Sequence, residues 1–474
     1  RSRPALGLAL DADPATPSTG LLGSTATDRP AVTVTTDFHA ELAGAVLAAA
    51  RRLPPVPASI RTAVTSAGGT LRADPLSGAD RADPRHRVAE LASLTGHAAA
   101  ARAISVPFYT TYLVLALLVL LLLLVHVARG RPLGRARATV ALIAGAVPAG
   151  SFAANAVPWW PRGGPWTQGL TYAGLTLAAA AVLTAAALGV ARLARRAGRT
   201  RRSVCFTAAG LVAAATWALI AVDALTGSHL GWNAPLGYHA LQAGRLHGLN
   251  NGQYALLATA AFVALAALLA GRARRTAVIA IAAVGLLTVL VDGLPTAGDD
   301  FGGPPALVLG AIVAALVAAH VKLTWRRILA AVGAAAAAVI ALSLADYARG
   351  PSRRTHIGDF VAQLLDGQAG PTLARKLAAW WEIARLTLPL LVILAAIAWL
   401  LWRGMRRTGL PAAYARTHRF APAAMAGLVV TLVVAMLTND SALAIGGLGL
   451  ALGGPLLMAG FAGLRPSRSF QAAL

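Results

Sequence analysis

Eleven apolar stretches follow one another along the chain from residue 106 onward, each near the length of a membrane-spanning helix. A bilayer core about 30 Å thick is crossed by about 20 predominantly apolar residues in a helix. The stretches are expected at 106–127, 138–156, 170–191, 204–225, 253–271, 276–292, 304–321, 328–346, 386–402, 421–437 and 441–463. The pattern predicts an all-α polytopic membrane protein with about 11 transmembrane helices, formed by residues 105–474.

Residues 1–104 contain no apolar stretch of that length, although nine of the 18 acidic residues lie there. The β-branched residues 32–36 predict a short strand, and an amphipathic pattern from Asp37 predicts a helix after it. Residues 71–87 alternate acids, bases and prolines, which predicts a surface loop or linker. One strand and one helix cannot bury a core. The segment is therefore expected to be the tail of a larger α/β domain or a loosely ordered arm.

Composition supports the membrane assignment, because 57% of the residues are apolar and only 13% are charged. An ordinary soluble domain is about a quarter charged. A single cysteine, Cys205, lies within an apolar stretch and excludes a disulfide framework and a thiolate metal site.

The basic residues that give the net charge of +24 are unevenly distributed among the connections between the apolar stretches. Alternate connections hold 23 Lys and Arg, the opposite connections hold eight, and the first 104 residues hold 11. No acidic residue lies in the six arginine-rich segments. By the positive-inside rule these segments are cytoplasmic, so the N-terminal segment is expected outside the plasma membrane and the C-terminus inside. The charge thus reflects topology, and no nucleic-acid partner is expected.

Several motifs resemble a family of actinobacterial polytopic membrane proteins of unassigned function that carry an alkaline-phosphatase-like (sulfatase-type) extracytoplasmic domain. The N-terminal segment contributes GLLGSTATDRPAVTVTTDFHAEL. The membrane part contributes GYHALQAGRLHGLNNGQYALLATAAF, VDGLPTAGDDFGG and SRRTHIGDFVAQLLDG. Family members usually carry an aromatic residue where Leu246 and His247 stand, and a Gly-Asn pair where Asn250 and Asn251 stand. The resemblance implies an extracytoplasmic head joined to a membrane module. The nucleophile and metal ligands of such a head are expected upstream of this sequence, so no phosphatase activity is carried over.

The loop expected at 226–252 holds more polar residues than a connection needs. Arg245 is its only basic residue other than histidine, and glycines beside it let backbone amides approach an anion. Together with His247, Asn250 and Asn251 it predicts a substrate-binding clamp for phosphate or pyrophosphate. The alternative is that Arg245 pairs with Asp223 or Asp292 and only fixes helix ends.

Three carboxylates lie in the sequence DGLPTAGDDFGGPP. Asp292, Asp299 and Asp300 offer oxygen ligands of the kind that Mg²⁺ or another hard cation prefers. Two alternatives stay open, namely arginine pairing or general-base catalysis by Asp300, and a merely solvated turn.

The longest outer loop is expected at 347–385. Helical periodicity over 356–365 predicts a short amphipathic helix on the membrane surface. Arg353 and Arg354 would bind an anionic headgroup while His356, which titrates near neutral pH, acts as a base. The alternative is a lipid-headgroup anchor without catalysis.

Elsewhere, Trp159, Trp160 and Trp166 predict an interfacial aromatic belt.

These residues favour a transferase that acts at the outer leaflet on a lipid-linked glycan or anionic headgroup, in cell-envelope biogenesis. The outer loop with Arg and His resembles, over short motifs, the O-antigen-ligase type of membrane glycosyltransferase. Arg245 and Arg353 would then neutralise the leaving pyrophosphate of a polyprenyl-linked substrate, and His356 or Asp300 would deprotonate the acceptor. Two other classes stay open, namely a transporter or lipid flippase, and a non-catalytic membrane anchor for a phosphatase-like head. Membrane lipids are expected partners in each case.

Overall fold

The computed structural model describes residues 20–24, 71–75, 84–198, 203–239, 248–294, 296–300, 302–350, 356–439 and 441–467. Two short strands, β1 (Gly20–Ser24) and β2 (Leu71–Pro75), pair antiparallel. The strand and helix expected at 32–36 and from Asp37 lie outside the described residues. The prediction of a loop over residues 71–87 is wrong at both ends of that range. Its first five residues form β2, which pairs with β1, and its last four begin α4. Proline is well suited to the first turn of a helix, where Pro84 lies.

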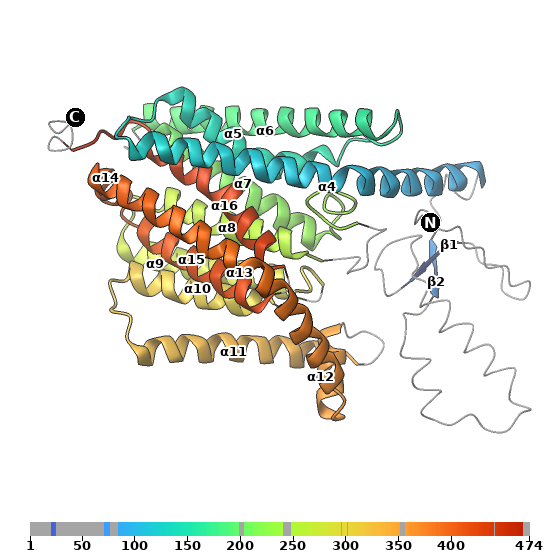
Figure 1. Cartoon of the computed structure of the whole chain (residues 1–474). Coiled ribbons are helices and arrows are strands. Elements are labelled where there is room, and N and C mark those ends of the chain that lie inside the picture. The colour runs from blue at the N-terminus through green and yellow to red at the C-terminus, as the bar shows by residue number, and fades with distance from the viewer. Residues whose placement is uncertain are drawn as a thin grey trace, which may run out of the picture.

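All other regular structure in the described residues is helical (Figure 1). The helices are α4 (Pro84–Ala128), α5 (Arg135–Ala154), α6 (Pro165–Arg196), α7 (Val204–Leu225), α8 (Asn251–Leu268), α9 (Arg274–Gly293), α10 (Gly303–Ala318), α11 (Trp325–Tyr347), α12 (His356–Leu365), α13 (Gly370–Arg407), α14 (Leu410–Thr417), α15 (Ala421–Thr438) and α16 (Ala442–Met458), followed by a 3₁₀ turn (Ala459–Phe461).

Nine helices within the described residues are long and apolar enough to cross a membrane. The two remaining predicted stretches also fall on helices, since 304–321 overlaps the shorter α10 and 386–402 lies inside the 38-residue α13. The prediction of a largely helical polytopic protein is thus confirmed at this level. The boundary expected between residues 104 and 105 falls inside α4, which continues through it.

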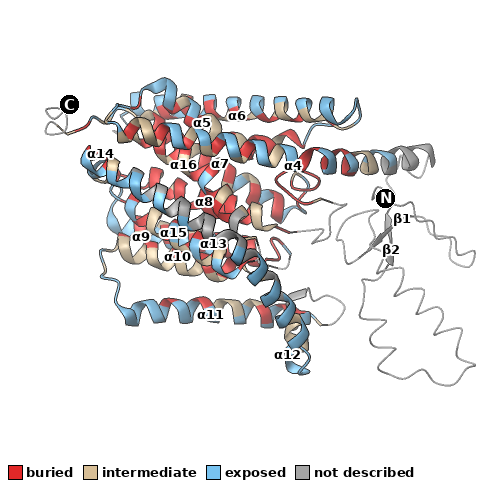
Figure 2. Cartoon of the chain, in the orientation of Figure 1, coloured by how far each residue is buried: buried red, intermediate tan, exposed pale blue. Residues whose placement is uncertain are grey.

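Helix α8 lies at the centre of the bundle and packs against α7, α9, α15 and α16. Figure 2 shows the contrast between such buried helices and the exposed faces of α6 and α11. Helix α11 lies at the edge of the bundle, beside α10 (Figure 1). Small residues permit the closest approaches. A Cβ atom on Gly310 of α10 would lie 1.9 Å from Thr431 Oγ1 and 2.6 Å from the Gly427 carbonyl oxygen of α15.

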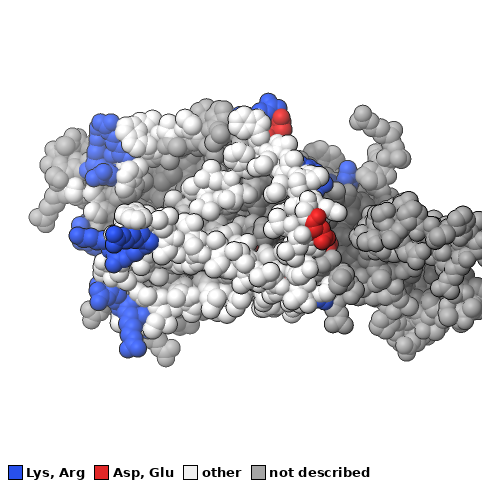
Figure 3. Space-filling view, turned by 90° about the horizontal axis from the view of Figure 1, so that it is seen from below, with Lys and Arg blue, Asp and Glu red and all other residues white. Residues whose placement is uncertain are grey.

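The two ends of the bundle differ in charge. The connections from α4 to α5, α6 to α7, α8 to α9, α10 to α11 and α13 to α15 carry the arginines, and we call this the arginine end. Asp223, Asp292, Asp299, Asp300 and Asp346 lie at helix ends opposite to it, which we call the acidic end. Figure 3 shows the largest groups of Lys and Arg at one end of the face in view, and the visible acidic residues, with a few further basic residues, toward the other.

Candidate functional site

The turn between α9 and α10 places three carboxylates at the acidic end. The backbone N–H of Asp300 donates to the Asp292 carbonyl oxygen at 2.9 Å, and that of Asp299 donates to the Leu294 carbonyl oxygen at 3.0 Å. Asp299 has a left-handed φ of 49°, which an aspartate tolerates better than most residues. The three aspartates are 0–2% exposed. The solvated turn, one of the sequence alternatives, is therefore wrong: these carboxylates are buried.

Asp300 caps α10. Its Oδ2 accepts the backbone N–H of Gly303 at 2.9 Å, which puts a carboxylate at the positive end of the helix dipole. Gly303 also lies between two other side chains: a Cβ atom there would stand 2.1 Å from Asp292 Oδ2 and 2.5 Å from the Tyr254 ring. Glycine at the start of α10 thus lets α8, α9 and α10 meet closely around the carboxylates.

A backbone hydrogen bond joins the loop after α7 to the turn between α9 and α10. The N–H of Leu249 donates to the Gly298 carbonyl oxygen at 2.7 Å, and Ser228 Oγ donates to the Gly248 carbonyl oxygen at 3.1 Å. Gly248 has a φ of +83°, and a Cβ atom there would lie 2.3 Å from the Gly298 carbonyl oxygen. The two polar loops that the sequence singled out therefore share one hydrogen-bonded network.

Asp223 organises the first part of that loop. Its Oδ1 accepts the Leu230 N–H at 2.7 Å and its Oδ2 accepts the Gly231 N–H at 2.8 Å. The carboxylate is buried at the C-terminal end of α7, with the residue 6% exposed. Two charge-assisted hydrogen bonds to backbone amides stabilise a carboxylate in such a place.

Asn250 and Asn251, expected to bind substrate, both make structural hydrogen bonds. Asn250 is the N-cap of α8 and forms a capping box with Gln253. Asn251 Nδ2 donates to Asn439 Oδ1 at 2.8 Å and to Ser441 Oγ at 2.7 Å, and Asn439 Nδ2 donates back to Asn251 Oδ1 at 3.1 Å. The pair joins the acidic ends of α8, α15 and α16.

A second polar cluster at the acidic end was not recognised from the sequence. Asn155, at the end of α5, donates through Nδ2 to the Leu230 and Trp232 carbonyl oxygens at 3.0 and 2.6 Å. Its Oδ1 lies 3.1 Å from His97 Nε2. A lone asparagine at the end of an apolar stretch was the only signal in the sequence.

The aromatic belt expected at the tryptophans is wrong for Trp159, which is buried, whereas Trp160 is partly exposed. His97 stacks on Trp160 at 3.9 Å between ring centroids and meets Trp159 edge-on at 5.5 Å. Trp159 is only 3% exposed, because Asn155 and Tyr172 cover it. Trp166 differs from them and is 87% exposed.

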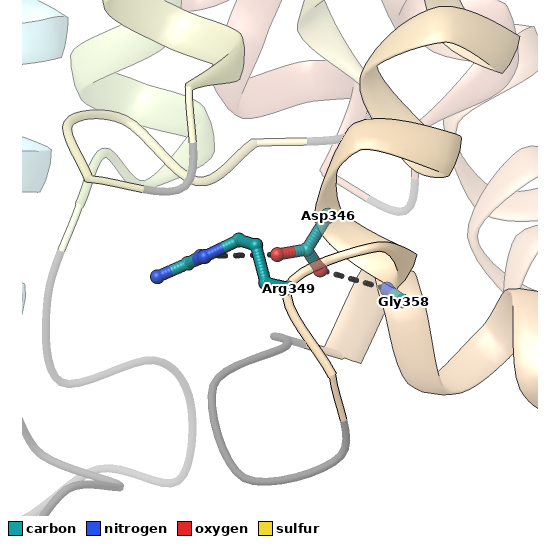
Figure 4. Close-up of polar contacts among 3 residues, drawn as sticks. All are labelled: Asp346, Arg349 and Gly358. Carbon is teal, nitrogen blue, oxygen red and sulfur yellow. Dashed lines mark hydrogen bonds and ion pairs between the residues drawn. The ribbon is translucent and has the colours of Figure 1, made fainter.

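Helix α12 forms where the periodicity predicts it, over His356–Leu365. Asp346, at the end of α11, accepts the Gly358 N–H through Oδ2 at 2.8 Å and binds Arg349 through Oδ1 at 3.0 Å (Figure 4). This fully buried carboxylate therefore caps α12 and fixes the corner between the two helices.

Four of the predicted site residues lie outside the described residues: Arg245, His247, Arg353 and Arg354. His356 is the first residue of α12, and its side chain is likewise outside the description. Among the described residues, no group of three or more His, Cys, Asp and Glu side chains is arranged to hold a metal ion. A magnesium site at Asp292, Asp299 and Asp300 stays a prediction.

No protein-family model, no curated protein and no solved structure matches the chain. The family resemblance noted from the sequence stays a prediction.

Proposed function

We propose that this protein is a plasma-membrane transferase that acts at the outer leaflet on a lipid-linked glycan or anionic headgroup. In this proposal the arginine end is cytoplasmic and the acidic end, with the N-terminal segment, is outside. The separation of charges between the two ends supports the orientation (Figure 3).

One observation carries the proposal: carboxylates at the acidic end are buried together with the loop that leads to Arg245. Asp292, Asp299 and Asp300 are 0–2% exposed, and Gly248, three residues after Arg245, lies against Gly298. Three residues of chain reach at most about 11 Å. In this proposal Arg245 reaches these carboxylates, because an arginine held by carboxylates can present its remaining N–H groups to a phosphate.

The proposed reaction joins an acceptor hydroxyl to the sugar of a polyprenyl-linked donor. The acceptor oxygen bonds to the anomeric carbon while the bond from that carbon to the phosphate oxygen breaks, and the electron pair stays on the leaving phosphate. Arg245 and Arg353 neutralise this charge, and a base takes the acceptor proton. His356 and Asp300 are the bases that the sequence offers.

The position of the ionisable groups favours a transferase over a transporter. The middles of the described spans contain no Asp, Glu, Lys, Arg or His, whereas a transporter places its polar binding groups near the bilayer midplane. The buried polar networks at the acidic end are also more than a passive anchor for a phosphatase-like head requires.

Arg245→Lys tests the proposal. A planar guanidinium binds phosphate at two points and an ammonium does not, so the variant should lose transfer while keeping wild-type abundance and insertion. The assay follows transfer of radiolabelled lipid-linked sugars, extracted from the producing cells, in vesicles with outward-facing protein. Arg162→Lys, in another connection at the same end, is the matched control. Full turnover by Arg245→Lys would remove the phosphate clamp from the reaction.

A further inference from the structure

His239 is the last described residue before the segment that contains Arg245. It follows the loop held by Asp223 and is only partly buried. Its Nδ1 lies 3.3 Å from Ser105 Oγ on α4. Among the described residues none is hydrogen-bonded to its other ring nitrogen, Nε2.

The hydroxyl of Ser105 fixes which ring nitrogen carries the proton. Ser105 Oγ donates its single proton to the Ala101 carbonyl oxygen one turn earlier in α4. It can therefore only accept from His239, which places the imidazole proton on Nδ1 and leaves the lone pair on Nε2.

The surroundings keep this imidazole neutral. Burial, and next the positive charge of Arg102, lower the pKa of His239 to about 4. Among the described residues, His97 on α4 is the other titratable group that interacts electrostatically with it. Both neighbours come from α4. Because the ordinary pKa of histidine is about 6.5, His239 stays unprotonated through the physiological range.

We propose that Nε2 of His239 is the general base that takes the proton of the acceptor hydroxyl, with Arg102 beside it. This assignment rests on the proposed transferase function and names a base that composition and motifs did not single out. As the acceptor oxygen bonds to the anomeric carbon, its proton moves to Nε2. The imidazolium then loses the proton to water, and repulsion from Arg102 favours that loss.

A weak base of this kind suits the reaction. Carboxylates of similar pKa serve as bases when sugars are transferred to water, since the acceptor proton becomes acidic only as the new bond forms. Asp300, in contrast, is 2% exposed and already accepts the Gly303 N–H, so it is less accessible to an acceptor than His239.

The test measures transfer by the full-length protein in vesicles, with the radiolabelled lipid-linked sugars described above. His239→Gln should lower kcat by about a hundredfold or more, as loss of a general base does, with KM little changed. Ser105→Ala should lower kcat by a smaller factor, because the tautomer with the proton on Nε2 of His239 then competes with the active one. Ser105→Thr keeps the hydroxyl and should therefore keep the wild-type rate. His126→Gln, at the arginine end, is the matched control.

The pH dependence of kcat/KM separates His239 from His356. With a pKa of about 4, His239 is still about 97% unprotonated at pH 5.5, whereas a histidine of ordinary pKa is only about 9% unprotonated there. Activity should therefore persist from pH 7 to pH 5.5.

Two failures are distinguishable. Full turnover by His239→Gln, or a tenfold loss of rate at pH 5.5, in a protein that does transfer would overturn the assignment of the base alone. No transfer by the wild-type protein with any extracted lipid-linked sugar would overturn the transferase proposal, and the role of His239 with it.

Discussion

Asp223 joins the end of α7 to the loop that approaches the proposed site. Its carboxylate accepts the backbone N–H groups of Leu230 and Gly231. Removing it leaves the buried Gly231 N–H and the partly buried Leu230 N–H without this acceptor, and an unsatisfied buried donor costs about 1–3 kcal/mol. Asp223→Ala should therefore lower the thermal stability in detergent by several degrees. Asp366→Ala, at an exposed position, should leave it unchanged. Equal melting temperatures for the two variants would contradict this role of Asp223.

Gly303 sets the distance between the carboxylates and α8. A methyl group there would overlap Asp292 Oδ2 and the Tyr254 ring, and neither can move far because both residues are fully buried. Overpacking of this kind costs about 1–3 kcal/mol. Gly303→Ala should accordingly destabilise the protein. Gly333→Ala, in open space on α11, should be neutral or slightly stabilising because alanine favours helix. Detergent melting curves of the two variants give the comparison, and a neutral Gly303→Ala would refute the close packing.

At the scale of the elements, a pair of side-chain amides holds α8 and α15 together at the acidic end. Asn251 and Asn439 exchange hydrogen bonds of 2.8 and 3.1 Å. Interhelical hydrogen bonds in membrane bundles contribute about 1 kcal/mol. The double-mutant cycle of Asn251→Ala and Asn439→Ala should thus show a coupling of about that size in reversible unfolding. Strict additivity would mean that the pair does not stabilise the helix ends.

Sequence patterns predicted the helices well and the site only in part. The apolar stretches and the α12 periodicity depend on local spacing, so they can be read without tertiary information. Local spacing does not predict the burial of Trp159 or the roles of Asn155 and Ser105, since each depends on which distant segment packs against the residue. The continuation of α4 through residues 104 and 105 was likewise not predicted, because the residues before 105 are too polar to extend the apolar stretch.

At the scale of the whole molecule, the proposed function depends on which side of the membrane the acidic end faces. The two ends are chemically distinct, with arginine-rich connections at one and buried carboxylates, His239 and α12 at the other. A site for a lipid-linked sugar at the outer leaflet requires the acidic end to be outside.

Cysteine labelling in intact cells tests that orientation most directly. Gly164 and Gly370 at the acidic end and Gly134 at the arginine end are exposed, have no neighbour that a side chain would meet, and have ordinary φ values, while the native Cys205 is buried. A membrane-impermeant maleimide should label Gly164→Cys and Gly370→Cys from outside, and should label Gly134→Cys only after the membrane is permeabilised. Labelling of Gly134→Cys in intact cells, with protection of the other two, would place the acidic end in the cytoplasm and contradict the proposed site.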